Sequence, residues 1–282
     1  MTTTFQEILQ DAYEKHYAVG AFNILSLEHL QGTIKAAEEL SSPVIIQLAE
    51  VQFPYCPIDL MAPLYIAAAK RAKVPVCVHL DHGNSIETCA KAIGLGFDSV
   101  MFDGAQLPFP ENIAATSKVV ELAKKNKVAV EAELGKVGLT EDTANISHPH
   151  DDVFTDPDEA AEFIEHTGTD ALAISIGNLH GKYIATPQLN IRRLQEISSK
   201  AGIPLVLHGG SGTSAEDFKA CIHNGISKIN VATALQLAVA DALTAQFGNG
   251  KTDFFKAKEI MAEATYDCVK NHILLFESNG KA

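Results

Sequence analysis

The chain has 282 residues and a formal net charge of −13 at pH 7, from 22 lysines and arginines against 35 aspartates and glutamates. Hydrophobic residues make up 46% of the chain and charged residues 20%, a balance that excludes a disordered chain and a fibrous rod. Only three residues are arginines, and nucleic-acid binding starts from a basic face. We therefore predict that the chain has no nucleic-acid partner.

Eight short apolar segments alternate with amphipathic segments along the chain. Most of the eight are nearly continuous aliphatic runs without alternation, which is typical of parallel strands buried on both faces. The predicted strands are residues 17–22, 43–47, 75–80, 99–102, 128–134, 171–175, 204–208 and 227–230. Eight strands alternating with helices predict an α/β fold of the (β/α)8 or TIM-barrel type. The alternative, a doubly wound open sheet, needs a glycine-rich turn after the first strand, and residues 23–26 do not provide one.

The segments between the strands carry signals for helix starts. Capping side chains stand before helical patterns at Ser26, Asp156, Thr186 and Ser214, and the second and third of these precede a proline. Residues 248–282 form a C-terminal extension with a helix predicted over residues 253–275. Residues 136–155 are irregular and follow the fifth strand, so we expect a mobile active-site loop there. The whole chain, residues 1–282, is predicted to be one domain.

The cellular location follows from cysteine usage and from two missing signals. The five cysteines are odd in number and show no CxxC spacing, which favours free thiols in a reducing compartment. The sequence opens without a basic and then apolar leader, and no run approaches 18 apolar residues. We therefore predict a cytoplasmic protein with no membrane partner.

Three histidines, His82, His180 and His208, fall at the ends of three different predicted strands, and each is followed by glycine. Three imidazoles that leave a fourth position open are typical of a catalytic zinc site, and the carboxylate of Glu133 is placed to join them. Asp103 and Glu133 are candidates either for a second cation site or for orienting the histidines.

Asp81 directly precedes the first of these histidines. Adjacent side chains in a strand point to opposite faces, so both can serve one site only where the strand ends and turns. A carboxylate beside a dication can exchange a proton with a substrate hydroxyl. The alternative is that Asp81 caps the helix that follows.

Two segments after the seventh and eighth strands are suited to an anion. Barrels commonly bind phosphate at this place, with backbone N–H groups and a helix N-terminus facing it. The residues concerned are Gly209, Gly210, Ser211, Asn230, Val231, Ala232 and Thr233.

Five motifs together resemble the class II, metal-dependent ketose-bisphosphate aldolases, and the tagatose-bisphosphate type most of all. They are VHLDHG at 78–83, VEAELG at 130–135, IGNLHGKY at 176–183, LVLHGGSG at 205–212 and INVAT at 229–233. The resemblance implies a zinc-dependent lyase of carbohydrate metabolism. Such an enzyme cleaves the C3–C4 bond of a ketose 1-phosphate or 1,6-bisphosphate to dihydroxyacetone phosphate and an aldehyde.

The resemblance also implies roles for individual residues. His82, His180 and His208 would bind zinc, with Glu133 near the metal. Asp81 would exchange the proton of the C4 hydroxyl, and Glu141 on the loop would move the C3 proton. The phosphate segments, together with Gly181, would hold the dihydroxyacetone phosphate half, with a monovalent cation (Na⁺ or K⁺) nearby. A homodimer or homotetramer is expected by resemblance alone.

Three positions depart from the pattern of the family. Asn178 and Ala49 stand where relatives carry hydroxyl residues, and Lys281 stands where many carry an arginine that binds the distal phosphate. A lysine offers a point charge in place of a bidentate fork. A substrate with a carboxylate or hydroxyl at its distal end therefore stays open beside the bisphosphate.

Two further hypotheses differ in chemistry or class. A Schiff-base aldolase needs a lysine in an apolar strand, and Lys228 stands near the start of the eighth strand rather than at its end. A non-catalytic subunit that stabilises an aldolase complex is disfavoured because Asp81 and all three histidines are retained.

Overall fold

The computed structural model describes residues 4–135, 138–139, 154–180, 188–248, 250–251 and 253–282. At residues 138, 139 and 180 it describes the backbone alone.

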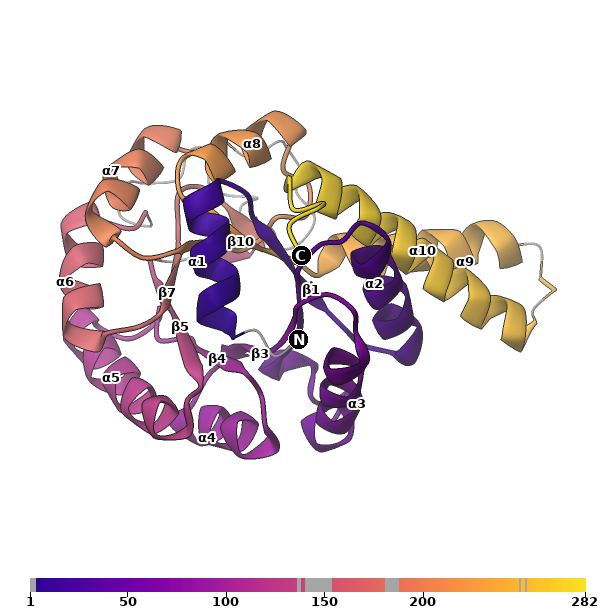
Figure 1. Ribbon diagram of the computed structural model, residues 1–282, viewed down its shortest axis with the longest axis horizontal. Coiled ribbons are helices and arrows are strands. Elements are labelled where there is room, and N and C mark those ends of the chain that lie inside the picture. Colours follow the sequence, from indigo (N-terminus) through magenta and orange to yellow (C-terminus); the bar gives the residue numbers. More distant parts are fainter. Residues whose placement is uncertain (1–3, 136–137, 140–153, 181–187, 249, 252) are drawn as a thin grey trace.

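Eight parallel strands close into a barrel in the order β1-β10-β9-β7-β5-β4-β3-β2, which confirms the predicted TIM-barrel fold (Figure 1). The strands are β1 (Val19–Asn23), β2 (Val44–Ala49), β3 (Val76–Gly83), β4 (Ser99–Phe102), β5 (Ala129–Leu134), β7 (Ala171–Ile174), β9 (Leu205–Leu207) and β10 (Ile226–Val231). Seven of them are buried at every position, and β3 at all but one. This burial explains why their sequences do not alternate between apolar and polar residues.

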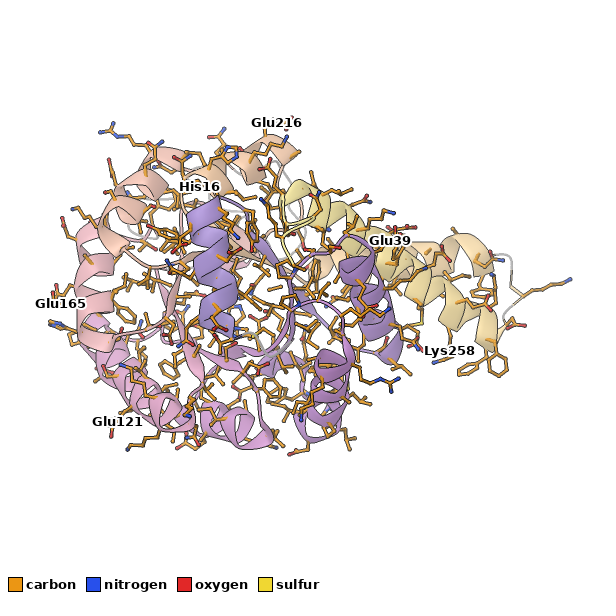
Figure 2. The ribbon with its side chains drawn as sticks, in the orientation of Figure 1. His16, Glu39, Glu121, Glu165, Glu216 and Lys258 are labelled. Carbon is orange, nitrogen blue, oxygen red and sulfur yellow. The ribbon has the colours of Figure 1, made fainter. Side chains whose placement is uncertain are left out.

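Helices and one short 3-10 turn surround the barrel, and three of the helices begin at predicted capping residues. They are α2 (Leu27–Glu39), η1 (Glu50–Gln52), α3 (Ile58–Arg71), α4 (Ile86–Leu95), α5 (Phe109–Asn126), α6 (Pro157–Thr167), α7 (Ile191–Ala201) and α8 (Ala215–His223). Ser26, Asp156 and Ser214 each accept a backbone N–H of the first turn. The start predicted at Thr186 lies outside the described residues, and α7 is capped by Asn190. Labelled charged side chains such as Glu121 and Glu165 point outward from this ring (Figure 2).

An N-terminal helix that the sequence analysis did not predict, α1 (Phe5–Lys15), lies across the amino end of the barrel (Figure 1). Thr4 and Glu7 form its capping box. Its buried face packs into the amino end of the barrel, where the ring of Phe5 stacks on that of His79 with the ring centroids 5.3 Å apart. The amino end is therefore closed to solvent, and the carboxyl end is left for the site.

The predicted C-terminal helix is present as α10 (Phe254–Leu275), capped by Asp253, and it forms a projecting hairpin with α9 (Thr233–Phe247) (Figure 1). The later part of α10 packs on α2 and on β1. Gly32 permits the approach to α2, because a Cβ there would lie 2.7 Å from the Cβ of Thr265. Thus α10 covers the barrel beside α2, whereas α9 buries only Leu235 and Val239.

A small parallel ribbon, β6 (Gly138–Leu139) with β8 (Leu179–His180), lies outside the barrel sheet. Most of the predicted active-site loop, residues 136–155, falls outside the described residues. All five cysteines are free thiols. None of the helices in the described part of the chain combines the length and the apolarity needed to span a bilayer.

Candidate active site

A pocket of about 340 Å³ opens at the carboxyl ends of the strands, where barrel sites form. Residues from β1, β3, β5 and β10, from the segments after β4 and β9 and from the start of α9 line it. They include Asn23, Asp81, His82, Asp103, Glu133, Gly209, Ser211, Asn230 and Thr233. The structure thus brings most of the described candidate residues to one place.

Asp81 and His82 both line this pocket although they are neighbours in β3. His82 adopts a left-handed backbone with φ 44°, and the pairing of β3 with β4 shifts register between Leu80 and Gly83. This departure from regular strand geometry removes the usual alternation of faces. A non-glycine residue held at positive φ costs about 1 kcal/mol or more. This backbone strain falls on His82, which is itself a candidate metal ligand.

The imidazoles of His82 and His208 meet edge to face, with Nε2 of His82 2.9 Å from Nδ1 of His208. The other nitrogen of each ring contacts a carboxylate. Nδ1 of His82 lies 2.8 Å from Oδ2 of Asp103, and Nε2 of His208 lies 2.8 Å from Oε1 of Glu131. Carboxylates placed behind histidines in this way commonly orient metal ligands.

The electrostatics around this pair suit a cation. Burial, reinforced by the charge of Asp103, raises the pKa of Glu133 to about 8. Burial opposes the charged form of His82, but Asp81, Asp103 and Glu133 outweigh it and raise the pKa of His82 to about 10. A divalent cation would reverse both of these protonations.

One buried carboxylate oxygen also points to a metal. Oε2 of Glu133 has no hydrogen-bond partner among the described residues and lies 3.8 Å from Nδ1 of His208. Donor atoms of Asp81, His82 and His208 lie within 4.8 Å of one another, as do those of His82, Asp103 and Glu133. Nitrogen and carboxylate oxygen donors are ligands that zinc accepts, so these residues fit the ion. The backbone of His180 lies in β8, and its side chain falls outside the described part.

Asp81 is 4% exposed and is held by two amides. Nδ2 of Asn23 donates to Oδ2 of Asp81 at 2.9 Å, and Nδ2 of Asn230 donates to Oδ1 at 3.0 Å. Burial opposes ionisation, but His82, His208 and Lys228 together with the Asn23 hydrogen bond hold the pKa of Asp81 below its usual value. The carboxylate is therefore ionised and pre-oriented.

The alternative role for Asp81 is wrong, because Ser85 caps the following helix, α4. Asn23 was missed by the sequence analysis. The available signal was a polar residue that follows the first predicted strand directly.

The two phosphate segments lie on the pocket wall, although not every member faces it. Oγ of Ser211 accepts from the backbone N–H of Ala234 at 2.9 Å, which ties the loop after β9 to the first turn of α9. Gly210 faces the packed side of its loop, since a Cβ there would lie 2.8 Å from a methyl of Ile229. Val231 is buried in the hydrophobic core.

The structure separates Lys281 from the pocket and so corrects its predicted role at the distal end of the substrate. Nζ of Lys281 lies 5.5 Å from the ring centroid of Tyr17, which precedes β1 at the amino end of the barrel. Asn178 also has a different role, because its amide donates to the backbone oxygen of His208 at 3.1 Å. Ala49 lines the pocket. Glu141 and Gly181 lie outside the described residues.

Lys228, the lysine considered for a Schiff base, lies inside the barrel. Its side chain is 0% exposed, and Nζ lies 2.9 Å from Oε2 of Glu131 and 2.6 Å from Oδ1 of Asn230. It does not line the pocket. An ammonium group held in this way is poorly suited to attack a carbonyl.

Comparisons with known proteins give one consistent result. A family model described as "Fructose-bisphosphate aldolase class-II" matches residues 3–281. A Bacillus subtilis (strain 168) protein described as "Probable fructose-bisphosphate aldolase" is 45% identical over 240 residues, 84% of this chain and 83% of that protein. A fructose-bisphosphate aldolase of Staphylococcus aureus (strain Mu50 / ATCC 700699) is 39% identical over 289 residues, 99% of this chain and 98% of that protein.

A solved structure agrees with these sequence matches. The crystal structure of the YdjI aldolase from Escherichia coli K12 superposes with a TM-score of 0.88 at 36% identity, and the match covers 100% of both chains.

Proposed function

The chain belongs to the class II fructose-bisphosphate aldolase family, and on that premise we propose that it is a zinc-dependent lyase that cleaves the C3–C4 bond of a ketose phosphate. The products are dihydroxyacetone phosphate and an aldehyde. The observation that carries the proposal is the meeting of Asp81, His82 and His208, whose donor atoms lie within 4.8 Å of one another, with Nε2 of His82 2.9 Å from Nδ1 of His208.

In this proposal His82, His180 and His208 hold zinc, and Glu133 lies close enough to join them. When bound there, zinc supplies a Lewis acid that stabilises the negative charge left on the ketone half after cleavage. Asp103 and Glu131 keep the rings of His82 and His208 in place. A second cation at Asp103 and Glu133 is the alternative use of those carboxylates.

Asp81 acts on the aldehyde half. Its ionised carboxylate takes the proton of the C4 hydroxyl, the C4–O bond becomes a carbonyl, and the electrons of the C3–C4 bond remain on the ketone half as an enediolate. Asn23 and Asn230 hold both carboxylate oxygens during the transfer. Glu141 then protonates C3, which yields dihydroxyacetone phosphate.

The phosphate of the ketone half lies, in this proposal, against Gly181, the segment from Gly209 to Ser211 and the segment from Asn230 to Thr233. Helix α9 begins at Thr233 on the pocket wall, and the backbone N–H groups at the N-terminus of a helix stabilise a bound anion. Gly210 contributes through the backbone conformation of its loop, and Val231 through the backbone at the end of β10. A Na⁺ or K⁺ ion beside the phosphate belongs to the same proposal.

For the distal end of the substrate we favour phosphate. The relatives are named fructose-bisphosphate aldolases, and the reason for doubting a bisphosphate rested largely on Lys281, which lies at the other end of the barrel. A carboxylate-terminated ketose 1-phosphate is the second candidate, and the tagatose or fructose configuration at C4 stays open.

A homodimer or homotetramer is our proposal for the assembly. The projecting hairpin supports it, because Phe254 and Phe255 at its tip are 72% and 76% exposed. The five free thiols support a reducing compartment, and we propose the cytoplasm.

The test is a cleavage screen with the zinc-loaded enzyme. Fructose and tagatose 1,6-bisphosphates, carboxylate-terminated ketose 1-phosphates and unmodified ketoses are compared by the release of dihydroxyacetone phosphate. We expect cleavage of a bisphosphate that a chelator abolishes and zinc restores. Cleavage that survives complete zinc removal, or a lysine adduct trapped by borohydride, would refute the zinc mechanism. Zinc binding without cleavage of any ketose phosphate would favour a non-catalytic subunit.

A further inference from the structure

A buried ion pair crosses the barrel directly beneath the pocket. Lys228 on β10 and Glu131 on β5 are 0% exposed, and Nζ of Lys228 lies 2.9 Å from Oε2 of Glu131. The two strands are not neighbours, because β9 and β7 stand between them. A buried ion pair is often no more stabilising than the apolar residues that could replace it. Its presence therefore calls for a role other than stability.

The Glu131 end of the pair orients a proposed metal ligand. Lys228 occupies the Oε2 side of the carboxylate, and the Oε1 side accepts from Nε2 of His208 at 2.8 Å. A neutral imidazole carries its proton on one nitrogen only. If Glu131 holds that proton on Nε2, the nitrogen whose lone pair can bind a metal is Nδ1, the atom that faces His82.

The Lys228 end of the pair orients the proposed base. Nζ donates to Oδ1 of Asn230 at 2.6 Å. An ammonium group can only donate, so the oxygen of that amide must face Lys228 and its nitrogen must face away. Nδ2 of Asn230 then lies 3.0 Å from Oδ1 of Asp81, to which it donates. The same nitrogen lies 3.3 Å from Nε2 of His208, which cannot accept from it while it donates to Glu131.

We propose that Lys228 is a positioning residue that sets the metal ligand and the base at the same time, through Glu131 and through Asn230. The inference rests on the proposed function, since it assumes zinc at His208 and proton transfer at Asp81. Lys228 touches neither substrate nor metal. It fixes which nitrogen of His208 has the lone pair for a metal and which atom of Asn230 faces Asp81.

The test separates orientation from folding by measuring two quantities on each variant. Zinc dissociation constants are obtained by competition with a chromophoric chelator, and thermal unfolding midpoints are measured on the metal-free full-length chain. Glu131→Gln should raise the zinc dissociation constant about 10- to 100-fold, the usual effect of losing a carboxylate behind a metal histidine. Lys228→Met should raise it too, lower the midpoint, and reduce kcat at saturating zinc.

The double variant Lys228→Met/Glu131→Gln carries neither buried charge, so it should recover the unfolding midpoint lost in Lys228→Met. It should nevertheless keep the weakened zinc binding and the reduced kcat. If Lys228→Met does not fold, the double variant carries the test. Ser42→Ala is the matched control, because Ser42 is equally buried and its Oγ contacts Oγ of Ser278 at 2.9 Å, just before β2 at the amino end of the barrel. Its zinc affinity should equal that of the wild type.

The opposite results would overturn the inference. If the double variant recovered zinc affinity and kcat together with stability, the pair would be structural. If the single variants bound zinc as tightly as the wild type and kept its kcat, the positioning role would be wrong. A wild-type chain that bound no zinc would refute the proposed function instead, so the two failures can be told apart.

Discussion

Replacing Asp81 with asparagine changes the charge of the proposed base while keeping its shape. In the wild type both oxygens of Asp81 accept from amides, one from Asn23 at 2.9 Å and one from Asn230 at 3.0 Å. An asparagine offers one acceptor oxygen and one donor group. One of the two neighbouring amides must therefore face a donor and lose its hydrogen bond.

The expected losses follow from this geometry. A hydrogen bond to a charged group contributes about 1.5–3 kcal/mol, so the asparagine at position 81 is also held less firmly. The amide cannot take the C4 proton, and loss of a general base typically lowers the rate about 10²- to 10⁴-fold. That range corresponds to about 3–5 kcal/mol of transition-state stabilisation. The metal histidines are unchanged, so zinc should still bind.

The assay measures kcat for the best bisphosphate of the screen together with the zinc content per chain. Asp98→Asn is the matched control. Asp98 accepts from the backbone N–H of Val78 at 2.8 Å, immediately before β4 at the amino end of the barrel, and we expect normal turnover for this variant. Near-normal turnover of Asp81→Asn would refute the assignment of the base. Loss of zinc along with activity would show that Asp81 acts as a metal ligand.

Three further predictions address other parts of the molecule. Gly32→Ala should destabilise the fold by about 1–3 kcal/mol, because the added methyl meets α10 at Thr265. Gly94→Ala should stabilise it by about 0.5–1 kcal/mol, because Gly94 lies in α4 with open space around it. Thermal unfolding midpoints equal to that of the wild type would contradict both expectations. Glu141→Ala should slow exchange of the C3 proton of dihydroxyacetone phosphate, followed by NMR, more than it weakens binding; unchanged exchange would assign that proton to another group. Lys281→Ala should leave kcat/KM for a bisphosphate within about twofold of the wild type, well below the tenfold change that 1.4 kcal/mol would give, and a larger fall would return Lys281 to the substrate.

The sequence determined the barrel and the strand ends at which its chemistry gathers. Short apolar runs without alternation are typical of strands that are buried on both faces of a sheet, and eight of them alternating with helices leave few other architectures. The carboxyl ends of parallel strands meet on one rim. Polar residues such as Asp81, His82 and His208 could therefore be assigned to a common site before any distance was known.

Contacts inside and around the barrel were decided by tertiary structure alone. Lys228 reads in the sequence as a charged residue within an apolar strand, and nothing local identifies Glu131 across the barrel as its partner. The resemblance placed Lys281 at the distal end of the substrate, but its position depends on how α10 returns along the barrel beside α2. The pattern of a strand indicates which of its residues are buried. The ion-pair partner of a residue, and the end of the barrel at which it lies, depend on how distant elements pack, and that information is absent from any single segment.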